Sequence, residues 1–112
     1  MSKITTHVLD IARGSPAAHV HIKLERRMSD GSYKEIGSGR TDHDGRLRSL
    51  APDQIEEGVY RITFDTRSYF DAHQLQSFYP EASIAFEVRD ANQHYHVPLL
   101  LSPYGYSTYR GS

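Results

Sequence analysis

Hydrophobic and polar side chains alternate with a period of two along much of this chain. Val20, Ile22 and Leu24 alternate with polar residues, and the same pattern recurs in residues 60–65 and 84–89. Successive side chains of a strand point to opposite faces, so this alternation is typical of strands with one face buried and one in water.

Turn-forming dipeptides separate the alternating runs. Asp30-Gly31, Asp44-Gly45 and Glu57-Gly58 each lie between two apolar segments, and Asp-Gly sequences favour tight turns between strands. Short strands at regular spacing with turns between them predict a sandwich or a barrel of about eight strands.

One segment departs from the strand pattern. Residues 68–76 are predicted to form a short helix, because Ser68 and Asp71 have the spacing of a capping box. Pro80 follows soon afterwards and prevents a long continuation. The chain is therefore predicted to be a single, nearly all-β domain spanning residues 1–112.

Composition narrows the classes of function. The formal net charge is −1, and acidic and basic residues are scattered, so no basic field points to nucleic acid. The chain has no cysteine, which excludes disulfides and thiolate metal sites. Neither a membrane span nor a signal peptide is visible, which predicts a cytoplasmic protein. No nucleotide-binding fingerprint or serine-hydrolase elbow is present.

Histidines are the first candidates for chemistry. If Ile4 and Val8 face the core, His7 projects from the opposite face of its strand. His94 and His96 likewise share one face of a later strand, and His19 with His21 forms a second pair with the same spacing. Such pairs could hold a metal, but zinc needs three or four ligands and no further ligand is fixed by the spacing. Solvated strand histidines remain the alternative for all five.

The last residues are unusually rich in polar groups for a chain end. After an apolar run, the chain closes with Tyr109-Arg110-Gly111-Ser112. Arg46, beside the Asp44-Gly45 turn, offers a planar guanidinium group suited to a polar or anionic ligand. On residue type alone, Arg46, Tyr109 and Ser112 could equally be solvated.

Taken together, these segments closely resemble one known family. The residues that carry the resemblance are His7-Val8-Leu9-Asp10, Gly14-Ser15-Pro16-Ala17, Thr41-Asp42-His43-Asp44-Gly45-Arg46 and the segment from His94 to Ser112. They are similar to the transthyretin-like 5-hydroxyisourate hydrolases over residues 4–112. The closing tetrapeptide is the most specific element, because the hormone-carrying transthyretins lack it.

The resemblance implies a fold, an assembly and a site. The implied fold is a mostly β, transthyretin-like sandwich of two four-stranded sheets with one short helix. The implied assembly is a homotetramer, a dimer of dimers, with active sites in a channel between dimers. Carried over by motif, His7, Arg46 and His96 would be catalytic, and His7, Arg46, Tyr109 and Ser112 would bind substrate.

The implied reaction is hydrolysis of 5-hydroxyisourate to 2-oxo-4-hydroxy-4-carboxy-5-ureidoimidazoline in urate breakdown, without a metal or an organic cofactor. Either His7 or His96 would deprotonate the attacking water, and Arg46 would stabilise developing charge. Two other interpretations stay open. One is a carrier of a small aromatic ligand, since fold does not decide function. The other is a metal-binding β-domain built on the two histidine pairs.

Overall fold

The computed structural model describes residues 2–112. Within them the chain forms ten strands and one helix, and three of the strands are only two residues long. In chain order the elements are β1 (Ile4–Asp10), β2 (Ser15–Pro16), β3 (His21–Arg27), β4 (Tyr33–Arg40), β5 (Arg46–Leu47), β6 (Gly58–Phe64), α1 (Thr66–Ala72), β7 (Ala82–Val88), β8 (Tyr95–His96), β9 (Leu99–Ser102) and β10 (Gly105–Thr108).

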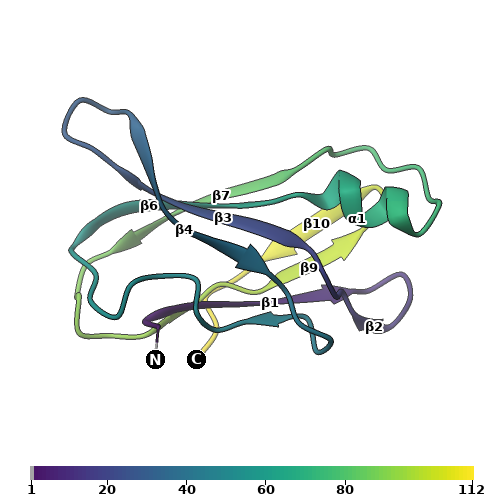
Figure 1. The fold of residues 1–112 in the computed structure, drawn as a ribbon, viewed down its shortest axis with the longest axis horizontal. Coiled ribbons are helices and arrows are strands. Elements are labelled where there is room, and N and C mark those ends of the chain that lie inside the picture. Colours follow the sequence, from purple (N-terminus) through teal and green to yellow (C-terminus); the bar gives the residue numbers. More distant parts are fainter. Residues whose placement is uncertain (1) are drawn as a thin grey trace.

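The strands form two layers, as Figure 1 shows. One sheet has the order β4-β3-β6-β7 and is antiparallel throughout. The other has the order β10-β9-β1-β2, with the short strands β5 and β8 also paired to β1. The predicted sandwich of two sheets is confirmed, and its second sheet is a four-strand path to which two additional short strands are attached.

The core lies between the two sheets and follows the alternation of the sequence. The buried apolar residues of β1, β3 and β6 are all even-numbered, while their odd-numbered neighbours are largely more exposed, apart from the buried Thr5 and Glu25. Burying one large apolar side chain contributes about 1.5–3 kcal/mol, so this double row holds the layers together. The fully buried apolar side chains of these three strands are Ile4, Val8, Ile22, Leu24, Tyr60, Ile62 and Phe64.

A buried polar contact joins β1 to the helix. The Tyr69 hydroxyl donates to Oδ2 of Asp10 at 2.7 Å, and Oδ1 accepts the backbone N–H groups of Ala12 and Arg13. Burial and the hydrogen bond to Asp10 together raise the pKa of Tyr69 to about 12. With its acceptor sites occupied, the buried carboxylate anchors α1 against the end of β1.

The predicted helix bounds were wrong at both ends. The helix begins at Thr66, because the Asp65 carboxylate accepts both the N–H and the hydroxyl of Ser68 and acts as the N-cap. It ends at Ala72, and Gln74 then adopts a φ of 58°. Ser68 is thus inside the first turn rather than at its start.

The apolar run after His94 divides into two strands. Pro98 separates β8 from β9, since proline has no N–H to donate to a neighbouring strand. Both pieces nevertheless pair in parallel with β1. No helix among residues 2–112 is long and apolar enough to cross a membrane.

Candidate active site

Strand β1 brings the predicted site residues to one face of the sheet. His7 lies opposite Arg46 of β5, on one edge of β1, and Thr5 lies opposite His96 of β8, on the other edge. Residues opposite each other in paired strands share a face. The outward face of β1 therefore carries Thr5 and His7, flanked by Arg46 and His96.

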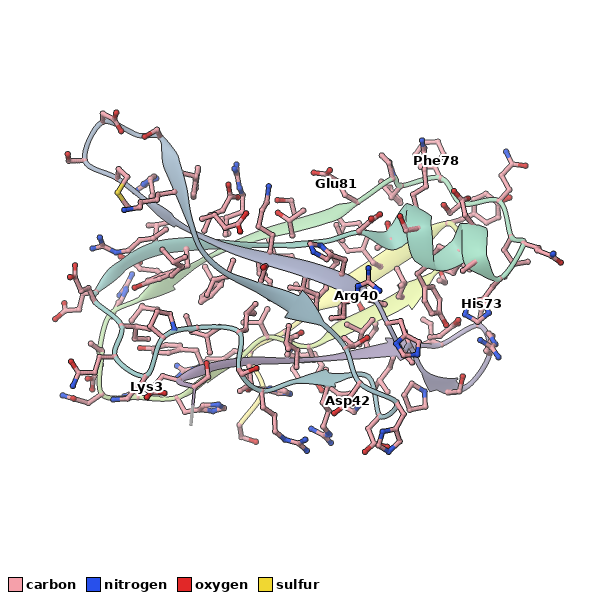
Figure 2. All side chains as sticks on the ribbon, in the orientation of Figure 1. Lys3, Arg40, Asp42, His73, Phe78 and Glu81 are labelled. Atoms are coloured by element: carbon pink, nitrogen blue, oxygen red, sulfur yellow. The ribbon has the colours of Figure 1, made fainter. Side chains whose placement is uncertain are left out.

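A tight turn delivers Arg46 to this face. Oδ1 of Asp42 accepts the backbone N–H groups of Asp44 and Arg46, and these bonds, Arg46 first, lower the pKa of Asp42. Gly45 has a φ of 76°, and a Cβ there would overlap the carbonyl oxygen of Val8. The turn therefore needs glycine at this position. Figure 2 labels Asp42 in this turn, on the side of the molecule that carries β1.

The same turn orients the His7 ring. Nε2 of His7 lies 2.8 Å from the backbone carbonyl oxygen of Asp44. A carbonyl oxygen can only accept, so Nε2 carries the proton, and the lone pair of a neutral His7 is on Nδ1. The ring is half-buried and cannot turn freely without losing this bond.

His96 is held at two points. Its Nδ1 lies 2.8 Å from the Thr5 hydroxyl, and its ring packs against Gly111, where an added Cβ would lie 2.6 Å from Cδ2. Burial, followed by the positive charges of His94, His7 and Arg46, lowers the pKa of His96 below its usual range. The neutral ring therefore predominates at neutral pH.

The chain end is tied to the same strand. The Gly111 N–H donates to the His96 carbonyl oxygen at 2.9 Å. Arg110 donates to the side chain of Gln93 and stacks over the Tyr95 ring, with its guanidinium carbon 4.6 Å from the ring centroid. These contacts with residues in and next to β8 fix the chain end, so that Ser112 lies on the same face as His96.

An open pocket of about 240 Å³ forms where these elements meet. Polar and basic side chains and the beginning of β1 surround it. The residues that line the pocket are Thr5, Thr6, Arg46, Arg48, His94, His96 and Ser112. The neutral imidazole of His96 and the side chains of two arginines thus line the same pocket. That combination can activate water and bind a polar or anionic heterocycle.

The predicted site residues do not all line this pocket. Arg46, His96 and Ser112 do, and His7 lies beside them through its pairing with Arg46. Tyr109 is 58% exposed and lines a different, apolar pocket with Phe86, among others.

Sequence reasoning assigned no site role to Thr5 or Arg48, and it considered His94 only as a possible metal ligand paired with His96. Two of the three carry a local signal, since Thr5 is two residues before His7 and His94 is two before His96. A spacing of two on a strand places side chains on the same face.

Possible metal ligands gather elsewhere. Among the described residues, the histidine and carboxylate groups that lie close enough to share an ion are Asp42, His43 and Asp44, in the turn. Neither histidine pair forms such a group with a third ligand. Asp42 already accepts two backbone N–H groups, which is the ordinary chemistry of an Asp-initiated turn.

The fold is a two-sheet β-sandwich, and its pocket is lined by histidines and arginines. These features are typical of a β-protein that binds a small polar molecule. The model of the HIUase/Transthyretin family matches residues 4–111, and the chain belongs to that family. The predicted resemblance is thereby confirmed.

Relatives and solved structures agree with the family. A 5-hydroxyisourate hydrolase of Salmonella dublin is 44% identical over 97% of this chain and 80% of its own length. The mouse 5-hydroxyisourate hydrolase is 42% identical over 99% of this chain and 96% of its own length. Sea bream transthyretin, solved in complex with thyroxine, has 32% identity and a TM-score of 0.93, covering 97% of this chain and 94% of its own. The transthyretin fold is confirmed, and with such relatives the chain is an enzyme, as predicted.

Proposed function

We propose that this chain hydrolyses 5-hydroxyisourate to 2-oxo-4-hydroxy-4-carboxy-5-ureidoimidazoline, a step of urate breakdown. The observation that carries the proposal is a single pocket lined by Arg46, His96 and Ser112, with His7 beside it. The Salmonella dublin and mouse relatives are both 5-hydroxyisourate hydrolases. One of the relatives, in Arabidopsis thaliana, is described as a bifunctional protein of uric acid degradation.

His96 is the general base in this proposal. Its lowered pKa keeps the ring neutral, and Nδ1 is engaged by Thr5, which leaves Nε2 as the atom that can accept a proton from water. As the water oxygen bonds to the ring carbonyl carbon, its proton moves to Nε2. General-base assistance of this kind contributes about 10²–10⁴-fold.

Arg46 stabilises the negative charge that develops on the carbonyl oxygen. Its guanidinium group offers several donors in one plane, and its position opposite His7 directs it to the outward face of β1. Removing one such donor typically costs about 10²–10³ in rate. The backbone N–H of Arg46 is bound by Asp42, so the point from which the side chain extends is fixed before substrate arrives.

His7 completes the proton transfers. Its Nε2–H is engaged by the Asp44 carbonyl, so the opposite nitrogen, Nδ1, is the one available to orient water or, when protonated, to give a proton to the departing ring nitrogen. The C–N bond then breaks and the ring opens. Ser112 is proposed to hydrogen-bond the heterocycle, and Tyr109 to stack on it.

Within one chain, Tyr109 lines a different pocket from the one that contains His96. A role for Tyr109 in substrate binding therefore depends on how the chains assemble. We propose a homotetramer, in which a second layer of protein covers the open pocket and excludes water. Two features support it: β7 and β10 each end a sheet within residues 2–112, and the aromatic residues Phe78 and Tyr106 are exposed near them. Light scattering coupled to size-exclusion chromatography measures the assembly.

The decisive experiment is the loss of freshly generated 5-hydroxyisourate, followed against its spontaneous rate. Wild-type protein is compared with His96→Asn and Arg46→Gln, and circular dichroism confirms that each variant folds. Acceleration by wild type that collapses in both variants supports the proposal. Binding of the heterocycle without acceleration by wild type would favour the carrier instead.

A further inference from the structure

Two pocket residues outside the proposed catalytic set contact His96. The Thr5 hydroxyl lies 2.8 Å from Nδ1 of His96 and 3.0 Å from Nε2 of His94. The two imidazole rings are nearly parallel, with an interplanar angle of 15° and centroids 6.4 Å apart. Thr5 is only 7% exposed, so little water competes for its hydroxyl. One buried hydroxyl therefore bridges two histidines.

The bridge couples the proton positions of the two rings. A hydroxyl has one proton, so it donates to one ring nitrogen and accepts from the other when both rings are neutral. If Thr5 donates to His96, then His96 carries its proton on Nε2, and that atom cannot act as a base. If Thr5 donates to His94, it accepts from Nδ1–H of His96, and Nε2 of His96 has a free lone pair.

We propose that Thr5 and His94 are positioning residues that hold His96 as its Nδ1–H tautomer and accept its proton during turnover. The inference rests on the proposed function and goes further, because it assigns a role to two residues that the family resemblance did not bring into the site. Within residues 2–112, no hydrogen bond engages Nε2 of His96, which leaves that atom free to act on water.

The proton transfer balances without any other reactant. When Nε2 of His96 takes a proton from water, the ring becomes a cation. Nδ1–H of His96 then gives its proton to Oγ1 of Thr5, as Oγ1 gives its own proton to Nε2 of His94. The Thr5 hydroxyl is regenerated, His96 is neutral with its proton on Nε2, and the positive charge is on His94.

The surroundings favour this direction of charge movement. His96 is half-buried and faces His7 from β1 and Arg46 from β5, with Arg48 lining the same pocket. Within one chain His94 is exposed and therefore less desolvated than His96, so a positive charge costs less there. Moving the cation from His96 to His94 takes it from a half-buried position to a less buried one.

The test uses three variants of the full-length protein and one control. Thr5→Val removes the hydroxyl while keeping the shape and the β-branch, Thr5→Ser restores a hydroxyl, and His94→Phe removes the receiving nitrogen while keeping a ring. Thr63→Val is the matched control, because the Thr63 hydroxyl contacts Ser83 on the other sheet. Each protein is measured for kcat, KM, the pH profile and the tautomer of His96 by nitrogen-15 NMR.

We expect Thr5→Val and His94→Phe to lower kcat by about 10–100-fold, by analogy with the range found when the hydrogen-bonded partner of a metal-binding histidine is lost. KM should change little, Thr5→Ser should recover most of kcat, and Thr63→Val should resemble wild type. The acid limb should move to lower pH in Thr5→Val, because protonated His96 loses an acceptor. It should move to higher pH in His94→Phe, because His94 contributes to the lowered pKa of His96 and the substitution removes that contribution, while those of His7 and Arg46 remain; Arg48 lines the same pocket.

The NMR measurement separates this inference from the proposed function, since it needs no substrate. Wild type should have His96 as the Nδ1–H tautomer, and Thr5→Val should lose that preference. An Nε2–H tautomer in wild type, or the same tautomer in both proteins, would overturn the inference even if hydrolysis is observed. If wild type does not hydrolyse 5-hydroxyisourate at all, the proposed function fails, while the tautomer still tests the bridge.

Discussion

Gly111 offers a sharp test of how closely His96 must be held. An alanine Cβ at this position would lie 2.6 Å from Cδ2 of the His96 ring, whereas ordinary carbon contacts begin at 3.4 Å. The two atoms must therefore separate by about 0.8 Å, the difference between these distances. Gly111 has no positive φ, so the cost of the substitution is steric rather than conformational.

The structure limits where that displacement can go. If the ring moves directly away from Thr5, its 2.8 Å hydrogen bond lengthens to about 3.6 Å, beyond the usual limit. If the chain end moves instead, the bond from Gly111 N–H to the His96 carbonyl is strained. Misplacement of a reacting group by about 1 Å can cost about 10²-fold in rate. We expect kcat/KM of Gly111→Ala to fall by about 10–100-fold.

The assay compares kcat/KM for 5-hydroxyisourate with the melting temperature. Gly105→Ala is the matched control, because a Cβ there meets only Oγ of Ser102, at 3.8 Å. We expect both variants to melt close to wild type, since each lies near the exposed chain end, and only Gly111→Ala to lose activity. If Gly111→Ala is folded and has wild-type kcat/KM, the reasoning about His96 is refuted.

Four further predictions follow from the site and its supports. The pH profile of kcat/KM should have an acid limb centred below 6.5, the usual pKa of histidine, because His96 has a lowered pKa and activity is lost only when pH falls through it; a limb centred above 6.5 would contradict His96 as the base. Gly45→Ala should lower the free energy of unfolding by about 1–3 kcal/mol in urea denaturation, from its left-handed backbone and the overlap with Val8. Tyr69→Phe should cost about 1–3 kcal/mol by the same measurement, because the Asp10 carboxylate loses a buried donor; equal stability would show that water replaces the hydroxyl. Activity should be unchanged after incubation with a chelator, and a loss restored by added zinc would revive the metal interpretation of the histidine pairs.

Local pattern was enough to predict the strands and their faces. Alternation over residues 20–24 and 84–89 corresponds to β3 and β7, and the orientation of His7 away from Ile4 and Val8 is confirmed. Strand geometry makes this possible, since the side-chain period of two is set by the backbone alone. Capping was harder to predict, because the N-cap is Asp65, whose side chain reaches forward to Ser68.

The site shows where local pattern stops being sufficient. Spacing placed His94 and His96 on one face, and motif resemblance selected His7, Arg46 and Ser112. Neither indicated that Tyr109 lines another pocket in the single chain, or that Thr5 bridges the two histidines. Both facts depend on which strands are neighbours.

The sequence by itself determined the two-layer β-architecture, the residues able to do proton chemistry and the family to which they belong. Tertiary structure alone decided their mutual distances, because β1 pairs with strands about 40 and 90 residues away along the chain. Register between such distant strands is set by packing of the whole core. Only that packing puts a threonine hydroxyl between two imidazoles and a glycine against one of them.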